Sequence, residues 1–532
     1  MPGVAPAATD GDHKAMAAYL RARAADADGR PRLAAAGYAT ALAALPGDEV
    51  IAIRAYRQAL TVGDMALADR AAAILRRSNV APNDAEILLL SSAIAADDLR
   101  EAEAAIDRIA SGSLDFLAPV MRGWLALERG EDNAAALLDV EAGNPIGARY
   151  ARSHRALILL AQGKIEDGVA ATRAALGADA GNLDLRLAAA ARLADKGQRQ
   201  TAEALLTGND PVMVRAREQL GDKRRRGDGA TTAAEGIALL LTQLAADIGA
   251  EGGSLLGIAL SRAALRLDPD EARTRLVLAR ALAEDTPELA LAEIARIGEA
   301  SPLAPLAAAQ AAMIRSDMGD TDSALALAHA RATEPDAAPA FISGYADLLT
   351  NAGRHAEAAA EYGRAADALR AEGRPVPWTL LLQRGAALEQ ADRWAEAKPL
   401  LEAALAAAPE EPVVLNYLGY SQVERGENLA AAEALIAKAV ALRPDDGAII
   451  DSLGWAQYMQ GRHKQAVETL EQAAKAEPAD PEINEHLGDA YWAVGRRFEA
   501  RYAWRAARLY ADDEASARIA GKISNGLQSA AR

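Results

Sequence analysis

The side chains that most often perform catalysis or bind metal ions are few and widely spaced in this sequence. Its six histidines are far apart, so none forms the paired spacing of a helical metal site. The absence of cysteine excludes disulfides, thiolate nucleophiles and zinc–sulfur sites. No phosphate-binding glycine loop and no nucleophile-elbow motif occurs. The sequence therefore predicts no catalytic, cofactor or metal site, and a protein that is not an enzyme.

The net charge of the chain favours protein partners over nucleic acids. The net charge is −17, whereas contacts to phosphates require clustered lysine and arginine, so a nucleic-acid partner is not expected. One dense basic run, residues 223–226, is flanked by Asp222 and Asp228 within the glycine-bounded stretch 221–232. We interpret this stretch as a solvated loop rather than a binding site for a phosphate or an acidic partner. The expected partners are proteins or peptides with basic or apolar segments.

The composition favours helices. Hydrophobic residues make up 51% of the chain, much of it alanine, and aromatic residues only 4%. Alanine favours helix, whereas strands prefer β-branched and aromatic residues. At 532 residues the chain is also too long for one ordinary core, which indicates several domains or a repeat array.

No apolar run is long enough to span a bilayer, and no transmembrane segment is expected. The first residues show neither a basic region nor an apolar region of an export signal. The protein is therefore expected either in the cytoplasm or, if this chain begins after a removed signal, in an exported compartment. The sequence leaves both open.

A period of 34 to 35 residues organises the carboxyl-terminal third. A small residue of the first helix, a turn glycine and an alanine of the second helix each recur in register. The three sets are Gly419, Gly454 and Gly488; Gly426, Gly461 and Gly495; and Ala432, Ala466 and Ala500. Pro444 and Pro478 end two of the units. Each unit is predicted to be a helical hairpin that packs on the next.

The same period extends upstream in weaker form. The turn positions there are Gly29, Gly63, Asp97, Gly130, Gly163, Gly197, Gly319, Gly353 and Asp392. We predict an all-α solenoid of about thirteen or fourteen hairpins. Its expected regions are a flexible amino terminus (1–15), a degenerate array (16–207), an irregular helical segment with long loops (208–300), a regular array (301–511), and a capping helix with a tail (512–532).

These hairpins resemble tetratricopeptide (TPR) repeats, which stack into a right-handed superhelix. The resemblance implies a concave surface, lined by the first helix of each hairpin, where partner proteins bind. Positions expected on that surface hold large aromatic and polar side chains, which are typical binding anchors. The alternative is that these rings pack against the next repeat or against the terminal cap. The candidates are Asn416, Tyr417, Tyr420, Asp451, Trp455, Tyr458, Glu485, His486, Asp489 and Trp492.

One familiar TPR activity does not fit these positions. Receptors for chaperone tails use lysine, asparagine and arginine to bind terminal carboxylates. Here Asp451, Glu485 and Asp489 occupy such positions and would repel the ligand. A carboxylate-binding groove is therefore not expected.

Residues 378–508 further resemble a bacterial group of long TPR proteins. The strings "LNYLGY", "DSLGW" and "EHLGDAYWAVGRRFEARYAW" carry this likeness. The group includes outer-membrane lipoproteins that face the periplasm, and one branch presents substrates to a carboxyl-terminal processing protease. The resemblance implies a non-enzymatic adaptor with such a role and favours the periplasm if an export signal is missing from this chain. The alternative is a structural component of the cell envelope or of polysaccharide export.

Overall fold

The computed structural model describes residues 10–139, 144–222, 229–249, 255–335 and 337–527, and all regular secondary structure among them is helical. The helices form two compact units, Met1–Ala338 (unit 1) and Pro339–Arg532 (unit 2), and each is described by itself. The basic run at 223–226 lies outside the described residues.

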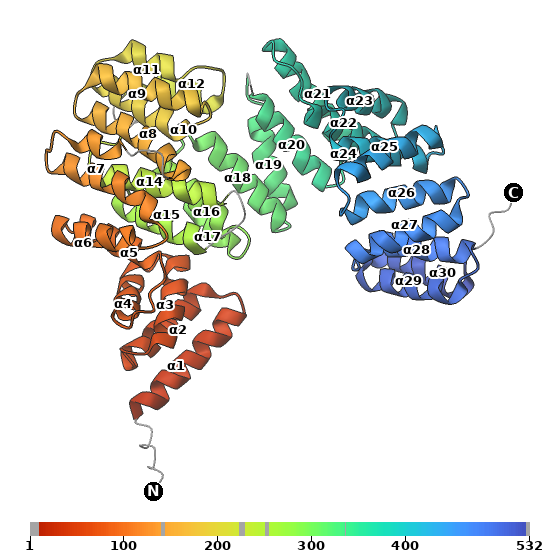
Figure 1. The fold of residues 1–532 in the computed structure, drawn as a ribbon, viewed down its shortest axis with the longest axis horizontal. Helices are drawn as coiled ribbons and strands as arrows, with labels where there is room; N and C mark the ends of the chain where they lie inside the picture. Colours follow the sequence, from red (N-terminus) through yellow and green to blue (C-terminus); the bar gives the residue numbers. More distant parts are fainter. Residues whose placement is uncertain (1–9, 140–143, 223–228, 250–254, 336, 528–532) are drawn as a thin grey trace, which may run out of the picture. The chain divides into compact units, whose positions relative to one another are not determined.

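Unit 1 contains the helices with lower numbers in Figure 1. They are α1 (Asp10–Ala27), α2 (Pro31–Ala44), α3 (Glu49–Val62), α4 (Met65–Arg77), α5 (Ala85–Ala95), α6 (Leu99–Ala110), η1 (Asp115–Leu117), α7 (Ala118–Glu128), η2 (Ala134–Leu138), α8 (Pro145–Ala161), α9 (Ile165–Ala178), α10 (Leu183–Asp195), α11 (Arg199–Leu205), α12 (Pro211–Gln219), α14 (Ala233–Ile248), α15 (Leu255–Leu267), α16 (Ala272–Leu282), α17 (Pro287–Ile294), α18 (Ala304–Asp317) and α19 (Thr321–Ala332).

Unit 2 contains the remaining helices, stacked in sequence order (Figure 1). They are α20 (Pro339–Asn351), α21 (His355–Ala371), α22 (Trp378–Gln390), α23 (Trp394–Ala407), α24 (Pro412–Glu424), α25 (Leu429–Leu442), α26 (Gly447–Met459), α27 (His463–Ala476), α28 (Pro481–Ala493), α29 (Arg497–Tyr510) and α30 (Asp513–Asn525).

Successive helices pair as hairpins, which confirms the predicted all-α solenoid. The turn between paired helices uses a left-handed residue at the positions that the period predicted, for example Gly461 at φ 77° and Gly495 at φ 85°. Asp97 and Asp392, which stand in place of turn glycines, adopt the same conformation at φ 58°. Because this region favours glycine and tolerates aspartate, the repeat persists where the glycine is lost.

Small residues bring the two helices of a hairpin together in unit 2. A Cβ placed on Gly454 would lie 2.6 Å from Leu470 Cγ of α27, and one on Gly419 would lie 2.6 Å from Ile436 of α25. Leu470 and Ile436 are fully buried, so neither can yield space easily. Gly419 and Gly454 therefore set the spacing between the two helices of their hairpins.

Replacing Gly454 with valine is expected to destabilise unit 2 by about 2 to 3 kcal/mol, because the added side chain overpacks the contact with Leu470. Urea unfolding followed by tryptophan fluorescence measures this, since five of the six tryptophans lie in unit 2. Gly344→Ala in α20 is the control, because its Cβ would meet nothing within 4 Å. Equal losses in the two variants would contradict the close-approach role of Gly454.

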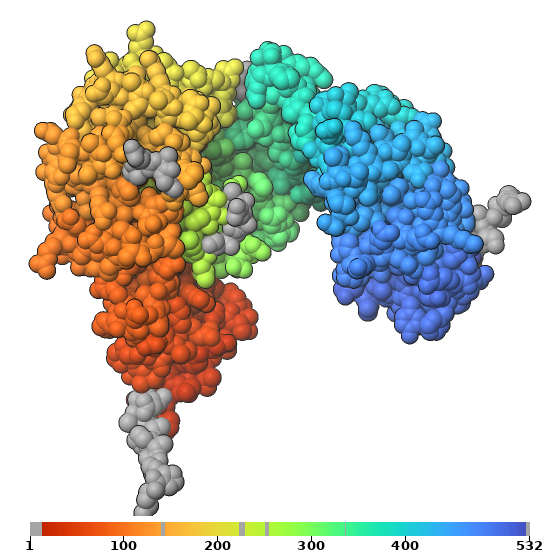
Figure 2. Space-filling view, in the orientation of Figure 1, coloured from red at the N-terminus to blue at the C-terminus, as the bar shows by residue number. Residues whose placement is uncertain are grey.

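Unit 1 differs from a simple open stack, because α14 and α15 pack across its first helices. α14 contacts α5, α7 and α8, and α15 contacts α3 and α5. These are the first helices of four successive hairpins, so α14 and α15 cover the inner face of this part of the array. In Figure 2 the yellow-green atoms of this segment lie against the orange atoms of the earlier helices. The expectation of an open concave surface is therefore wrong for this stretch.

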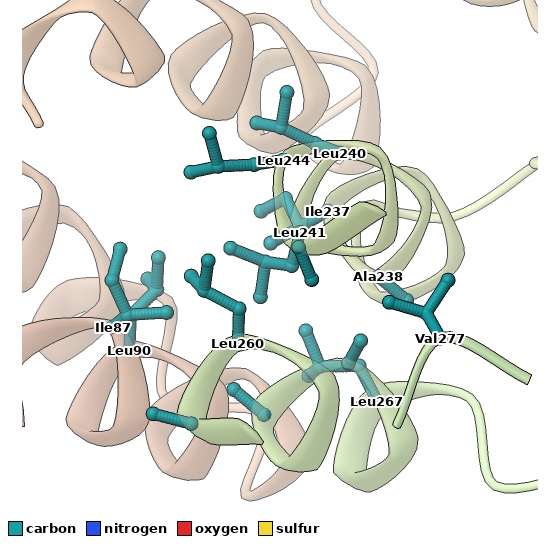
Figure 3. Packing of buried hydrophobic residues seen from close by; sticks show 14 of the residues in the cluster. Ile87, Leu90, Ile237, Ala238, Leu240, Leu241, Leu244, Leu260, Leu267 and Val277 are labelled. Atoms are coloured by element: carbon teal, nitrogen blue, oxygen red, sulfur yellow. The ribbon is translucent and has the colours of Figure 1, made fainter. Parts of the chain in front are cut away.

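The contact between α14–α15 and the array is apolar at its centre. Ile87 and Leu90 of α5 point toward Leu260 of α15 and Leu241 of α14, and all four are buried (Figure 3). The helix α14 begins at a capping box, in which Thr232 and Glu235 bond to each other's backbone N–H groups. Burial of this apolar face is what fixes the hairpin in the array.

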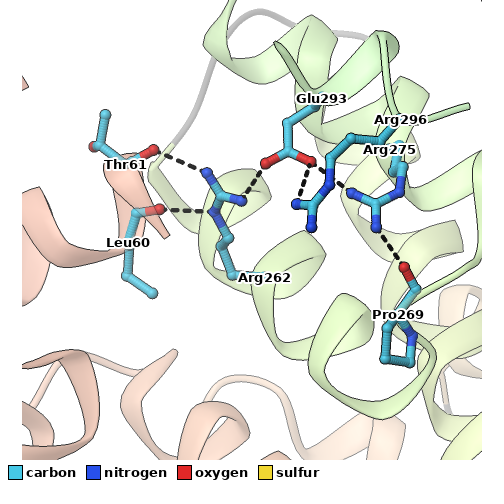
Figure 4. A network of polar contacts seen from close by, with 7 residues as sticks. All are labelled: Leu60, Thr61, Arg262, Pro269, Arg275, Glu293 and Arg296. Atoms are coloured by element: carbon cyan, nitrogen blue, oxygen red, sulfur yellow. Dashed lines mark hydrogen bonds and ion pairs between the residues drawn. The ribbon is translucent and has the colours of Figure 1, made fainter. Parts of the chain in front are cut away.

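A buried charge network joins α15 to the end of α3 (Figure 4). Arg262 donates to the carbonyl oxygens of Leu60 at 2.9 Å and Thr61 at 3.0 Å, which α3 leaves without helical partners. Glu293 of α17 pairs with Arg262 at 2.6 Å and with Arg275 at 2.7 Å. Burial opposes the charge of Glu293, but the surrounding arginines outweigh it and hold its pKa below the usual value. The network thus links residues about two hundred positions apart.

His154 of α8 is fully buried between α7 and α14. Its Nδ1 accepts a hydrogen bond from Trp124 Nε1 at 2.9 Å, so Nε2 carries the proton and faces Gln243 Oε1 at 3.2 Å. Burial lowers the pKa of His154 to about 4, against the weaker opposing effect of Gln243. The folded protein therefore holds this histidine neutral.

Acidification is expected to destabilise unit 1 through His154. Because the folded pKa of about 4 lies below the ordinary 6.5, the stabilisation is complete above pH 6.5 and is lost as the pH falls toward 4. The loss between pH 7.5 and pH 5 should be about 2 kcal/mol. Urea unfolding at both pH values measures it, with His154→Gln as the reference that lacks this titration. An equal pH dependence in the two proteins would contradict the assignment.

Candidate functional site

The predicted site residues lie on three neighbouring first helices of unit 2. α24 carries Asn416, Tyr417 and Tyr420; α26 carries Asp451, Trp455 and Tyr458; and α28 carries Glu485, His486, Asp489 and Trp492. α24 contacts α26, and α26 contacts α28. These three first helices therefore lie side by side. We call the surface that they form the inner face of unit 2.

Trp455 is at the centre of a stack of rings. Its indole is nearly parallel to Tyr458, with centroids 4.8 Å apart, and to His486, with centroids 4.0 Å apart. Its Nε1 donates to Glu424 Oε1 of the preceding first helix. The stack therefore ties α24, α26 and α28 together while Trp455 and Tyr458 remain partly exposed.

The carboxylates around this stack contact tyrosine, tryptophan and histidine side chains. Tyr420 donates to Glu482 Oε1 at 2.7 Å, which links α24 to α28, and burial together with Glu482 raises the pKa of Tyr420. His486 Nδ1 lies 2.8 Å from Asp451 Oδ2. Burial opposes protonation of His486, but the charge of Asp451 outweighs it and raises the pKa of this histidine. The result is an acidic, aromatic surface on the inner face.

Two further candidates are covered by α30. Lys522 of α30 pairs with both Glu485 and Asp489 at 2.6 Å, and Arg518 also pairs with Glu485. Trp504 of α29 donates to Asp489 at 2.8 Å. A partner could reach Glu485 and Asp489 only if α30 moved, so their binding role stays a prediction.

The remaining candidates have separate surroundings. Trp492 packs against Trp504 at 5.4 Å between centroids and carries the Arg497 guanidinium 3.9 Å from its ring centre. Tyr417 donates to Glu389 at 3.3 Å, and Arg425 pairs with the same carboxylate at 2.6 Å. Trp492 thus packs against the second helix of its own hairpin and the apolar side chains of α30, whereas Tyr417 joins α24 to α22 of the preceding repeat. Packing of this kind is the alternative that the sequence left open.

The sequence reasoning missed Glu424 and Glu482. Glu424 is four residues after Tyr420, so the helical period placed it on the same side of α24 and could have identified it. Glu482 lies 62 residues from Tyr420, and no local pattern indicates their contact.

Besides the inner face of unit 2, two other kinds of site are a metal site and a cavity that could hold a small molecule. The described residues contain no group of three or more histidine, aspartate or glutamate side chains arranged to hold a metal ion. A cavity of about 920 Å³ lies in unit 1 beside α10, α14 and α16. Its wall includes Asp184, which pairs with Arg273 at 3.1 Å, and Glu271, whose pKa burial raises to about 7. This cavity joins residues too distant in the sequence for any motif to have indicated it.

Comparison with known families identifies the repeat. The family model described as TPR repeat matches residues 454–495, which run from the first-helix glycine of one unit to the turn glycine of the next. This stretch of unit 2 is therefore similar to the TPR repeat. In unit 2 each hairpin packs on the next over several successive hairpins.

Three solved structures are similar to this chain at low sequence identity. One, the "APC/C hetero-tetramer Cut9-Hcn1", is 15% identical with a TM-score of 0.39 and covers 98% of this chain and 97% of its own. TTC0263, a TPR protein of Thermus thermophilus, is 20% identical with a TM-score of 0.31 and covers 35% of this chain and 100% of its own. "MamA MSR-1 C2" is 22% identical with a TM-score of 0.27 and covers 34% of this chain and 97% of its own.

The comparison with curated proteins finds no match. Among the described residues, no helix has both the length and the apolar character needed to cross a membrane.

Proposed function

We propose that this TPR protein is a non-enzymatic scaffold that binds partner proteins through the inner face of unit 2. The observation that carries the proposal is the contrast between two inner faces. In unit 1, α14 and α15 cover the first helices of four hairpins. In unit 2, the described helices that contact α24 are its neighbours in the stack, so no further helix of this unit is packed across it to a comparable extent.

The side chains on this face support protein binding. Partly exposed Trp455 and Tyr458 stand beside exposed Glu424 and Glu482. Aromatic side chains next to polar groups are the usual high-energy contacts of protein interfaces. Hydrogen bonds to Glu424 and Glu482 hold Trp455 and Tyr420 in place, which reduces the entropy that binding costs.

Replacing Trp455 with alanine is expected to weaken partner binding at least tenfold, because it removes the ring that joins the three first helices. Partners captured by the full chain should be identified, purified and tested for direct binding by calorimetry. Trp394→Ala is the matched control, because Trp394 lies on the second helix α23 of the same unit. If both variants bound the partner as the wild type does, the proposed face would be wrong.

The finer role that we infer is recruitment of substrates to a carboxyl-terminal processing protease. Its support is the resemblance of residues 378–508 to the bacterial group described above. The experiment is reconstitution with the processing protease of the same organism, in which the scaffold should accelerate cleavage of captured partners and Trp455→Ala should not. A captured set of envelope or polysaccharide-export components, with no effect on the protease, would instead favour the structural role.

A further inference from the structure

The second helix of the last regular hairpin, α29, exposes large apolar side chains. Phe498, Tyr502 and Leu509 are 72%, 59% and 79% exposed. Together with exposed Arg505 they are spaced by four, three and four residues, so they form one row along a single side of the helix. We call these four residues the exposed stripe of α29. Contiguous exposed apolar groups are typical of surfaces where another molecule binds.

The same positions in the two preceding hairpins carry no such side chains. In α27, which is 34 residues earlier in the register of Ala466 and Ala500, the residues are Lys464, Glu468, Glu471 and Lys475. In α25, another 34 residues earlier, all four positions are alanine. These eight side chains are exposed as well. Because the hairpin folds with charged or small residues there, packing does not explain the exposed stripe of α29.

The side chains of the stripe are held by contacts with one another. The ring centroids of Phe498 and Tyr502 are 5.0 Å apart, and the guanidinium carbon of Arg505 lies 5.9 Å from the centre of the Tyr502 ring. Such contacts reduce the entropy that these side chains lose when a partner binds. From Phe498 to Leu509 the stripe extends about 16 Å along the helix axis, which is three turns.

α29 also carries positive charge without a negative partner, although the whole chain has a net charge of −17. Among the described residues no ion pair involves any of its four arginines, which are Arg497, Arg501, Arg505 and Arg508. Every other described arginine of unit 2 except Arg384 forms an ion pair. The one acid of α29, Glu499, pairs with Arg496 just before the helix. Three of the four unpaired arginines each precede a stripe residue by one position, so they line one flank of the stripe.

An acidic amphipathic helix fits this surface better than the other occupants. The spacing of four, three and four residues is that of a coiled-coil seam, whose partner is another helix. An anionic bilayer fits poorly, because exposed Asp512, Asp513 and Glu514 follow Tyr510 directly and would repel it. A second copy that docked through the same stripe would bring the arginines of the two α29 helices together, and like charges repel.

We propose that the exposed stripe of α29 is a second interaction surface, which binds an acidic amphipathic helix of a partner protein. The apolar residues of that helix pack between Phe498, Tyr502 and Leu509, and its carboxylates pair with the arginines on the flank. This surface lies on a second helix, whereas the inner face of unit 2 is formed by first helices. The chain can therefore bind one partner through first helices and another through α29.

The test measures the binding of two synthetic peptides to the full chain. Each peptide has about three heptads with leucine at positions a and d, and it carries either glutamate or lysine at every e and g position. Like charges at e and g oppose self-association of each peptide. Calorimetry should show binding of the acidic peptide, with an affinity that falls as the salt concentration rises from about 0.05 to about 0.3 M.

Substitutions in α29 should identify the stripe as the binding surface. Phe498→Ala with Tyr502→Ala should weaken binding of the acidic peptide at least tenfold, because the aromatic contacts are lost. Arg505→Glu with Arg508→Glu should abolish it, because the charge of the surface is reversed. Any binding of the basic peptide should be unchanged by the aromatic substitutions. All four side chains are exposed, so thermal unfolding should show that both variants fold.

Lys464→Ala with Glu468→Ala is the matched control, because it changes the two equivalent exposed positions of α27 and leaves the net charge as it is. This variant should bind the acidic peptide as the wild type does. An equal loss of binding in the control and in Phe498→Ala with Tyr502→Ala would overturn the inference. Absence of binding of the acidic peptide would also overturn it.

Two further measurements decide against the other occupants. A dimer of the full chain in sedimentation velocity that Phe498→Ala with Tyr502→Ala disperses would make a second copy the occupant and overturn the inference. Binding of single-stranded DNA that the same variant loses would do so in favour of nucleic acid. The scaffold function of the inner face is tested separately with Trp455→Ala, so either proposal can fail without the other.

Discussion

Replacing Gly236 with alanine should lower the stability of unit 1 by about 3 kcal/mol, which is near the upper end of the usual effect of core overpacking. A Cβ at Gly236 would fall on the indole ring of Trp124. That ring is fully buried and is held by its hydrogen bond to His154, so it cannot move aside without breaking this contact. The first turn of α14 would therefore be lifted from α7.

The matched control is Gly257→Ala in α15, the other helix of the same hairpin. Its Cβ would make ordinary contacts, 3.9 Å from Ala245 O and 4.0 Å from Ala281 Cβ. Alanine is the better helix former, so this variant should be unchanged or more stable by up to about 1 kcal/mol. Urea unfolding followed by circular dichroism, with hydrogen exchange of the α14 amides, measures both. If Gly236→Ala were as stable as Gly257→Ala, the close contact of α14 with Trp124 would be refuted.

The Glu293→Gln substitution should destabilise unit 1 by about 3 to 5 kcal/mol, because it removes the negative charge between two buried guanidinium groups. The exposed fractions of the Arg262, Arg275 and Glu293 side chains are 9%, 7% and 9%, so water cannot compensate the loss. Release of Arg262 should also leave the carbonyl oxygens of Leu60 and Thr61 without their donors. Amides near the end of α3 should then exchange faster than those of α1.

Arg296→Gln provides the control within the same network. Arg296 lies 3.6 Å from Glu293, but its side chain is 64% exposed, so this ion pair should contribute less than about 1 kcal/mol. Chemical denaturation of the three proteins at pH 7 gives the comparison. Similar stabilities of Glu293→Gln and Arg296→Gln would show that the buried pairs do not stabilise the contact between α15 and α3.

The local features of the fold could be predicted from the sequence because each recurs with the period. The turn at Asp392 was identified by its place 34 residues before Gly426, although the residue is not glycine, and its backbone is left-handed. The first-helix glycines were likewise expected to permit close packing, as Gly454 does against Leu470. Because each turn residue and each close-packing glycine recurs in several repeats, one weak position can be identified from the others.

The longer-range features could not be predicted in this way. Nothing in the residues around Leu260 indicates that they pack against α5, because the contact joins segments about 170 positions apart and the period predicts contacts only between neighbouring hairpins. At the candidate site, the period located Trp455 and Asp451 correctly on first helices. It could not show that Tyr420 reaches Glu482 or that α30 supplies cations to Glu485.

The covering of unit 1 by its own later helices has a consequence for biosynthesis. Hairpins of a nearest-neighbour array can form as they leave the ribosome, each on the one before it. The segment 85–128 contains apolar side chains whose partners on α14 and α15 are translated more than a hundred residues later. During that interval Ile87 and Leu90 face water, so nascent chains stopped before residue 233 should bind chaperones strongly, whereas chains that extend past residue 282 should release them.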